Sequence, residues 1–205
     1  MSTAGSLRDR LAACDGYAFG LTLTEGLAAG QVLEGVDVEG CRFEGCVLEG
    51  AVLRGCTFTD SVFAGCNLSR VDLDGSRFID CRFVDSKALA VVWSRARRAE
   101  LSVRPWDFER CRLDLASFQE GSVAGSRFSD CSLRESDFAA SDCRGVDFGG
   151  SDLTGAVFVG TDLRGASLVG AGGYAFDPSQ NRVAGLRVEA GGAVALVEAL
   201  GVVVE

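Results

Sequence analysis

The chain has 205 residues, of which 47% are hydrophobic, with a formal net charge of -9 at pH 7 and no histidine. A strongly acidic surface disfavours direct binding to nucleic acid, and the missing imidazole removes the commonest general base and metal ligand. The sequence has no run of about 18 apolar residues, so we expect no association with a membrane.

The N-terminal segment, residues 1–20, precedes the periodic part of the chain. Within it, Leu7 to Cys14 predicts a short helix. Because the open edge of a repeat array needs a cover, we expect this segment to cap the repeats that follow.

A five-residue period begins near Leu33 and runs to Leu168, where every fifth residue is nearly always Leu, Phe or Val. We name this residue the centre of each repeat. Two positions before the centre the side chain is small, one position before it Asp, Asn or Arg is common, and two positions after it Gly is common. Because a period of five matches neither a helix nor a flat strand, the pattern predicts a solenoid.

Every fourth centre falls into a column of similar residues, which predicts a coil of twenty residues. The columns are Leu33, Leu53, Leu73, Trp93, Leu113, Leu133 and Leu153; Val38, Phe58, Phe78, Arg98, Phe118, Phe138 and Phe158; Phe43, Phe63, Phe83, Val103, Val123, Cys143 and Leu163; and Leu48, Leu68, Ala88, Phe108, Phe128, Phe148 and Leu168. We expect all four columns to fill the interior of a tube.

Repeats such as Cys41-Arg-Phe43-Glu-Gly45 and Thr161-Asp-Leu163-Arg-Gly165 resemble the pentapeptide-repeat family, over roughly residues 23–170. The resemblance implies an all-β fold, a right-handed quadrilateral β-helix with four pentapeptides in each coil. We therefore expect this β-helix over residues 21–170, followed by a short C-terminal α-helix.

Seven of the nine cysteines occupy the small position two residues before a centre. They are Cys41, Cys46, Cys56, Cys66, Cys81, Cys111 and Cys131. Free cysteine usually behaves as a small buried hydrophobe, and the chain has no CxxC pair, so we expect neither a metal site nor a cofactor. No signal peptide precedes the repeats, which favours a cytoplasmic protein whose cysteines stay reduced.

The repeat pattern weakens over residues 87–106, although the five-residue phase is kept. We expect an irregular coil or a projecting loop here, since Pro105 cannot donate to a sheet ladder. One interpretation is a degenerate coil with its arginines in water. We favour the other, a partner-binding loop, because arginine and tryptophan are enriched at interface hot spots. Its residues are Arg95, Arg97, Arg98, Arg104 and Trp106.

Residues 171–205 are expected to form a C-terminal cap and dimerisation segment. The sequence predicts that the coils end at Tyr174 to Pro178 and that a strand spans Asn181 to Val188. It then predicts a helix over residues 192–200 and a strand over residues 202–204. Apolar side chains on the helix predict an end-to-end homodimer contact. The residues of this interface are Val194, Leu196, Val197 and Leu200.

Carboxylates gather in the first full coil and in the last coils, and those of the last coils directly precede each centre and are expected to face outward. They are Glu34, Glu39, Glu44, Glu49, Asp137, Asp142, Asp147, Asp152 and Asp162. One interpretation is an acidic surface that binds a basic protein groove. The alternative is that they provide solubility and hydrogen bonds within the turns of the solenoid.

The tail, Asp177-Pro-Ser-Gln-Asn-Arg-Val183 followed by the segment from Leu196 to Val204, resembles the gyrase-protecting branch of the family. That branch includes the Qnr quinolone-resistance proteins, MfpA and the immunity proteins against microcin and albicidin. The resemblance implies a topoisomerase-poison resistance or self-immunity protein that binds DNA gyrase or topoisomerase IV through an acidic, partly DNA-mimicking rod and a mid-chain loop.

Catalysis is not expected, because the chain has no phosphate-binding glycine motif and no grouping of a nucleophile with a base. The alternative function is a non-catalytic structural or scaffolding protein with another protein partner, since the repeats alone do not discriminate between these roles.

Overall fold

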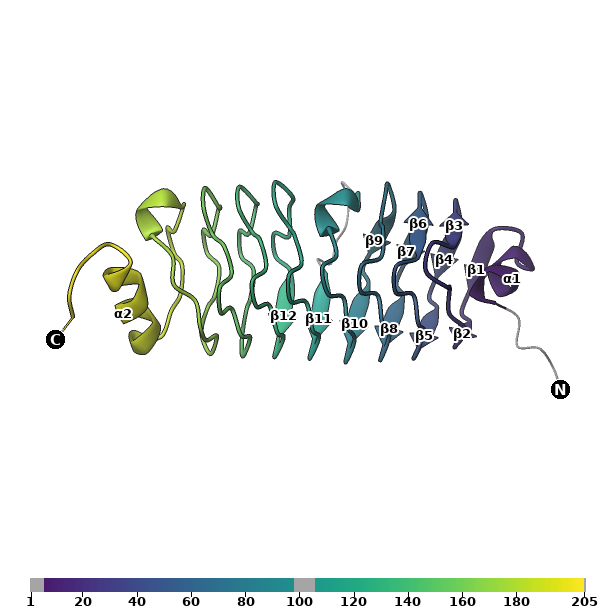
Figure 1. The fold of residues 1–205 in the computed structure, drawn as a ribbon, viewed down its shortest axis with the longest axis horizontal. Coiled ribbons are helices and arrows are strands. Elements are labelled where there is room, and N and C mark those ends of the chain that lie inside the picture. Colours follow the sequence, from purple (N-terminus) through teal and green to yellow (C-terminus); the bar gives the residue numbers. More distant parts are fainter. Residues whose placement is uncertain (1–5, 98–105, 205) are drawn as a thin grey trace.

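The computed structural model describes residues 6–97 and 106–204. The chain winds into a rod of stacked coils, with one helix at each end (Figure 1). The fold is the predicted right-handed quadrilateral β-helix with a short C-terminal α-helix.

The walls of the rod are very short strands, mostly three residues long. The strands are β1 (Tyr17–Phe19), β2 (Thr22–Leu23), β3 (Val32–Glu34), β4 (Asp37–Glu39), β5 (Arg42–Glu44), β6 (Val52–Arg54), β7 (Thr57–Thr59), β8 (Val62–Ala64), β9 (Arg77–Ile79), β10 (Arg82–Val84), β11 (Asp107–Glu109) and β12 (Arg127–Ser129). The helices are α1 (Leu7–Ala12), α2 (Ala190–Glu198) and the 3-10 turns η1 (Trp93–Arg95) and η2 (Pro178–Gln180).

The strands pair in parallel with strands of the neighbouring coil and form four faces. Face A contains β1, β4, β7 and β9, face B contains β2, β5, β8, β10, β11 and β12, and face C contains β3 and β6. Face D is formed by isolated parallel bridges, the first of which joins Val47 to Asn67. Most pairs join residues twenty positions apart, as Phe43 faces Phe63, which confirms the predicted length of the coil.

Phenylalanine rings stack along the interior of the rod, because in-register parallel strands place equivalent side chains above one another. The ring centroids of Phe43 and Phe63 lie 4.5 Å apart, and those of Phe63 and Phe83 lie 5.0 Å apart. Both contacts are stacked, and all three side chains are buried. The centres in the described part of the chain therefore fill the tube as predicted.

Many of the small residues two positions before a centre carry a thiol or hydroxyl that hydrogen-bonds one coil to the next. Cys66 Sγ donates to the carbonyl oxygen of Phe43 at 3.4 Å, and Ser76 Oγ donates to that of Leu53 at 2.9 Å. Burial raises the pKa of the Cys81 thiol to about 12, so this group stays protonated and able to donate. The nine cysteines are free and, except for Cys14, buried.

One coil is a repeat longer than its neighbours. On face A, Arg77 pairs with Arg97, twenty positions away, but on face B, Arg82 pairs with Asp107, twenty-five positions away. The additional five residues therefore lie between Arg97 and Asp107.

The predicted columns are wrong beyond this coil. Trp93 stacks on Phe118, with ring centroids 6.3 Å apart, and does not lie in a column with Leu113. Phe83 stacks on Phe108, from the next predicted column, at 4.7 Å. An insertion of one whole repeat leaves the five-residue phase unchanged, so the sequence pattern could not reveal it.

The N-terminal helix α1 lies where the sequence predicted a helix and covers the first coil. Ser6 and Asp9 form a capping box at its start, in which the Ser6 side chain accepts from the Asp9 backbone N–H. Leu7 and Leu11 are buried against the core, so α1 closes the apolar end of the tube.

The C-terminal prediction needs correction, because the coils do not end at Gly170. Arg182 bridges to Asp162 and Arg187 bridges to Ser167, both twenty positions apart. Asn181 replaces the usual thiol or hydroxyl, since its Nδ2 donates to the carbonyl oxygen of Phe158 at 2.9 Å.

Neither of the two predicted C-terminal strands is present as a strand. Residues 181–188 form isolated bridges, and residues 202–204 have no regular structure. Residues 202–204 follow α2, so they do not stack on a coil. The predicted helix is present, but α2 begins two residues earlier than expected.

Candidate functional site

The predicted loop arginines have different environments. Arg95 ends η1, and its guanidinium lies 3.3 Å from Asp72 Oδ1 and 3.7 Å from Asp74 Oδ1. Arg97 is exposed, and its backbone N–H donates to the carbonyl oxygen of Ser76. Residues 87–97 keep the parallel bridges of the coil, but the 3-10 turn η1 interrupts the regular turns within the segment that was predicted to be irregular. Arg98 and Arg104 lie outside the described residues.

Trp106 is a core residue, so the prediction that it contacts a partner is wrong. It is only 9% exposed and occupies the small position before the centre Phe108. Its Nε1–H donates to the carbonyl oxygen of Phe78 at 2.8 Å, the bond that a thiol or hydroxyl makes elsewhere. The indole thus keeps the ladder intact beside the longer coil.

A small cavity of about 40 Å³ lies next to this tryptophan, lined by Trp93, Trp106, Ala96 and neighbouring residues. Among the described residues, Trp93 Nε1 is the buried side-chain nitrogen that lacks a hydrogen-bond acceptor. The ring centroids of the two indoles lie 5.3 Å apart. Within the described residues, the Trp106 indole N–H has an acceptor and the Trp93 indole N–H has none.

The four glutamates of the first full coil lie one on each face and do not form a single patch. Glu39 accepts a hydrogen bond from the Tyr17 hydroxyl at 2.7 Å. Glu44 pairs with Arg42 at 2.6 Å, and Glu49 accepts from Asn67 Nδ2 at 2.9 Å and pairs with an arginine. Glu34 ends β3 and is exposed.

The five predicted aspartates form hydrogen bonds within the turns, as the alternative interpretation held. Each accepts from the backbone N–H two residues later, as Asp137 accepts from that of Ala139 at 2.8 Å; the others are Asp142, Asp147, Asp152 and Asp162. Because their bridges fall on four different faces, they surround the rod.

Arginines neutralise part of this acidic surface. The Arg144 guanidinium contacts both oxygens of Asp142 at 2.8 Å and lowers the pKa of that carboxyl to about 2. Asp162 pairs with Arg164 at 2.6 Å, and its side chain is only 16% exposed. Asp162 lies on the outer surface, as expected, but Arg164 and Arg182 cover much of its carboxylate.

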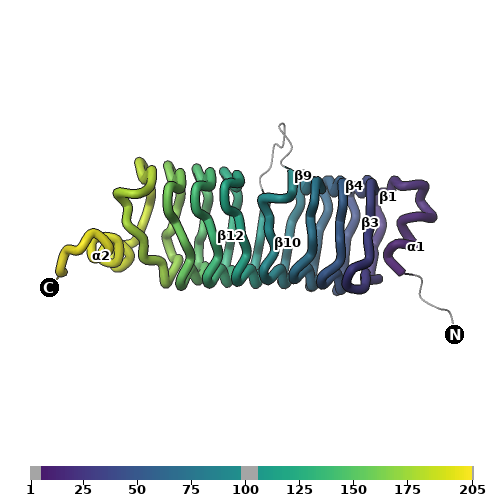
Figure 2. Tube along the Cα trace, turned by 45° about the horizontal axis from the view of Figure 1, so that its top comes forward, coloured from purple at the N-terminus to yellow at the C-terminus, as the bar shows by residue number. Residues whose placement is uncertain are grey.

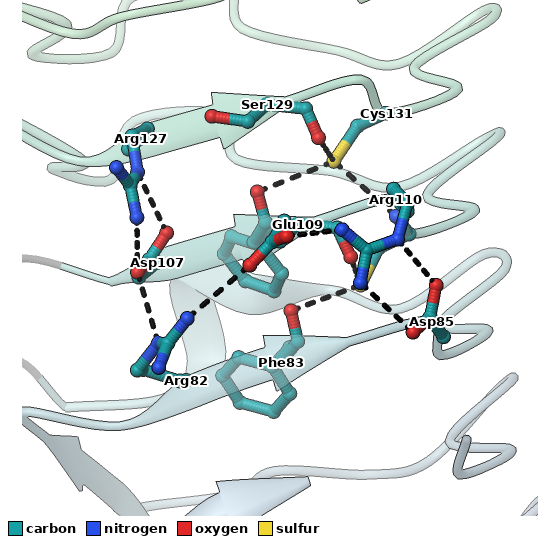
Figure 3. Close-up of polar contacts among 11 residues, drawn as sticks. Arg82, Phe83, Asp85, Asp107, Glu109, Arg110, Arg127, Ser129 and Cys131 are labelled. Atoms are coloured by element: carbon teal, nitrogen blue, oxygen red, sulfur yellow. Dashed lines mark hydrogen bonds and ion pairs between the residues drawn. The ribbon is translucent and has the colours of Figure 1, made fainter. Parts of the chain in front are cut away.

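A row of alternating charges crosses face B at the longer coil (Figure 3). Asp107 on β11 lies between Arg82 on β10, at 3.2 Å, and Arg127 on β12, at 2.7 Å. Arg110 pairs with Asp85 at 2.7 Å and lowers the pKa of its carboxyl. The sequence pattern does not reveal this row, because only the twenty-five-residue register places Asp107 beside Arg82.

The four predicted interface residues of α2 separate into two groups. Leu196 is 9% exposed and packs into the core, so it is not available as a contact between protomers. Val194 and Val197 are each 38% exposed, and Leu200 is 50% exposed. Residues 202–204 are also exposed. Figure 2 shows that α2 lies at the C-terminal end of the rod, so exposed apolar side chains gather at this end.

Within the described residues, no group of three or more acidic or cysteine side chains could hold a metal ion. The same part of the chain contains no helix long and apolar enough to cross a membrane.

Comparison with known proteins identifies the repeats. Residues 43–87 and 141–171 match pentapeptide repeats. No curated protein matches the sequence.

Two trypsin-treated forms of QnrB1, a plasmid-mediated fluoroquinolone resistance protein, share the fold. The first has a TM-score of 0.62 at 16% identity and covers 92% of this chain and 97% of its own. The second has a TM-score of 0.60 at 17% identity and covers 92% and 98%. The similarity thus extends along almost the whole of each rod.

Proposed function

This chain is a pentapeptide-repeat protein, and from that premise we propose that it binds DNA gyrase and relieves poisoning of the enzyme. The observation that carries the proposal is the match to QnrB1 along 92% of the chain. That relative is a fluoroquinolone resistance protein, so the poison relieved here would be one that acts on a type II topoisomerase, whether external or made by the producing cell.

Recognition, and not catalysis, is the proposed chemistry. The net charge of -9 favours a basic partner surface over DNA itself. A groove that handles DNA is basic, because it must attract phosphates. The rod would enter such a groove as a partial imitation of DNA, since arginines neutralise several of its carboxylates. Its association rate should therefore fall as salt increases.

The mid-chain arginines are the proposed second contact. Arg97 is exposed at the start of the additional repeat, and Arg98 and Arg104 follow in sequence. Trp106 takes no part in this contact, because its indole belongs to the core. The active form would be a homodimer joined through the exposed residues of α2.

A supercoiling assay with purified gyrase tests the proposal. The protein is titrated with and without a fluoroquinolone, and the linear DNA left by stabilised cleavage is scored. We expect the poison-dependent linear DNA to decrease as the protein is added. If neither supercoiling nor cleavage changes at any concentration, the gyrase proposal fails, and a scaffolding role with another partner replaces it.

Variants separate the loop from the rod. Replacing Arg97, Arg98 and Arg104 by Ala, with Trp106 retained, should reduce protection without unfolding the protein. The matched control replaces Arg54 and Arg187 by Ala, since both are exposed on other parts of the rod. Equal protection by both variants would show that the acidic faces alone recognise the enzyme.

A further inference from the structure

The first strand of the rod exposes two aromatic side chains. Of the thirteen phenylalanines, twelve are buried, whereas Phe19 is 64% exposed. Of the two tyrosines, Tyr174 is 5% exposed and Tyr17 is 51% exposed. Large apolar rings in water do not stabilise the rod, and aromatic residues are enriched in interfaces. This end of face A is therefore a candidate interaction surface.

Strand geometry places the two rings on the same side. Tyr17 and Phe19 point outward from β1, and Ala18 between them is buried. The parallel register sets Tyr17 beside Asp37 and Phe19 beside Glu39, on the adjacent strand β4. Two aromatic rings and two carboxylates therefore form a compact surface, which we name the β1–β4 surface.

The Tyr17 hydroxyl donates to Glu39 at 2.7 Å, and this bond raises the pKa of the phenol. The tyrosine thus stays neutral, and its ring is held beside the carboxylates. A shallow groove of about 320 Å³ begins at Tyr17 and runs over Thr57 and Thr59 to Arg77, which lies three coils from Tyr17.

The carboxylates of the β1–β4 surface are not neutralised. Glu44 on the adjoining face pairs with Arg42, and Asp142 at the far end pairs with Arg144. In the described part of the chain, neither Asp37 nor Glu39 has such an ion pair. The nearest arginine of the groove, Arg77, is separated from Asp37 by the Thr57 strand.

We propose that the β1–β4 surface binds an arginine side chain presented by a partner protein. A guanidinium stacks on aromatic rings and pairs with a carboxylate through two parallel N–H bonds, so the rings of Tyr17 and Phe19 together with the Asp37 carboxylate would meet both of its needs. An apolar partner would cover both carboxylates without compensating them, which is unfavourable. Nucleic acid would be repelled by the same charges.

The β1–β4 surface lies at the end of the rod opposite to α2 (Figure 1). Binding of an arginine side chain to this surface does not require that the partner be gyrase. It specifies the chemistry of a contact that the proposed function leaves open. Protection of gyrase and arginine binding can therefore fail or succeed separately.

The two tyrosines allow a direct test in the full chain. Labelling with 3-fluorotyrosine gives two fluorine resonances, one from Tyr17 in the surface and one from the buried Tyr174. The probe is a capped Gly-Arg-Gly-Arg-Gly peptide, and the control peptide carries uncharged citrulline in place of each arginine. We expect the Tyr17 resonance to move saturably with the arginine peptide only, while that of Tyr174 stays fixed.

Variants assign the contact to its residues. Phe19→Ala and Asp37→Asn should each weaken peptide binding about two- to fivefold, the size of an exposed cation–π or ion-pair contact. Val47→Ala removes an exposed apolar residue from face D and should change nothing. An unchanged Tyr174 resonance in each variant shows that the rod is intact.

Two results would overturn the proposal. One is a Tyr17 resonance that does not move with peptide up to about 5 mM, because a dissociation constant above this concentration is too weak for a specific contact. The other is an equal movement with the citrulline peptide, which would show that charge is not recognised. A gyrase assay run on Phe19→Ala then reports separately whether protection uses this surface.

Discussion

Trp106 shows how a large side chain fits a position that this fold otherwise gives to small residues. Its indole N–H donates to the carbonyl oxygen of Phe78, as Cys66 donates to that of Phe43. The hydrogen-bonding capacity of the position is thus preserved, although the size is not. The sequence shows that a tryptophan is unusual at this position, but the repeat pattern does not distinguish an exposed tryptophan from a buried donor.

We expect Trp106→Phe to lower the free energy of unfolding by about 1 kcal/mol beyond the effect of the smaller ring, because the Phe78 carbonyl loses its donor. Trp93→Phe is the matched control, since Trp93 Nε1 has no acceptor among the described residues and its loss removes no hydrogen bond. Urea denaturation, followed by the fluorescence of the remaining tryptophan, measures both. Equal losses in the two variants would contradict the assigned role of the Trp106 indole.

Asp142 should make the stability of the rod depend on pH. Its pKa is lowered from 3.8 to about 2 by the Arg144 ion pair, so the ionised form favours the folded state. The contribution is complete above the unfolded pKa and is lost as the pH falls from about 4 to about 2.

Asp142→Asn should therefore lower the free energy of unfolding at pH 7 by about 0.5–1 kcal/mol, the size of a surface ion pair. The difference from the wild type should disappear near pH 2. Denaturation at several pH values measures it, with Glu34→Gln as the control at an exposed carboxylate. A difference that persists at pH 2 would assign the effect to packing and not to charge.

At the scale of the repeat, the corners of each coil require a left-handed backbone. Glycine meets this requirement at many corners, but Leu115 has a φ of 61° and a side chain that is 58% exposed. The left-handed conformation costs a residue with a Cβ about 1–2 kcal/mol, whereas a glycine costs about 0.5–1 kcal/mol because of the chain entropy that it loses on folding.

Leu115→Gly should therefore stabilise the protein by about 0.5–1 kcal/mol, since no buried contact is removed. Leu115→Ala keeps the Cβ and should bring no such gain. Urea denaturation compares the two. If alanine stabilises as much as glycine, relief of the backbone conformation is not the cause.

The repeat pattern predicted the fold because the same residue types recur from one coil to the next. The centres, the small positions and the twenty-residue period all follow from a tube whose walls are three-residue strands. The additional repeat before Asp107 could not be predicted, because it preserves the pattern on which the prediction depends. The pairing of Arg82 with Asp107, twenty-five positions away on the neighbouring strand, reveals this additional repeat.

The candidate sites were less predictable than the fold. The aspartates before each centre are acidic in sequence, but whether they face a partner or accept from the next turn depends on side-chain geometry. The exposed Phe19 has no signal in the pattern, since a phenylalanine elsewhere in this chain marks the core. Phenylalanine thus occurs both in the interior of this rod and on its surface.

At the scale of the whole molecule, the two ends of the rod differ. The first coil is covered by α1, whose Leu7 and Leu11 are buried. The last coil is covered by α2, which buries Leu196 but leaves Val197 and Leu200 exposed. In the described part of the chain, only the C-terminal end therefore keeps an apolar helix surface, and a twofold contact between two such ends would remove it from water.

We expect the protein to be a dimer of two 21.5 kDa chains and Val197→Asp to make it monomeric, because a buried unpaired charge opposes association. Light scattering after size exclusion measures the mass. Leu196→Asp is the contrasting variant, since it should loosen α2 from the core and lower thermal stability. Val157→Asp, at an exposed apolar residue on the wall of the rod, should change neither mass nor stability. A wild-type protein that runs as a monomer would show that the exposed side of α2 serves another partner.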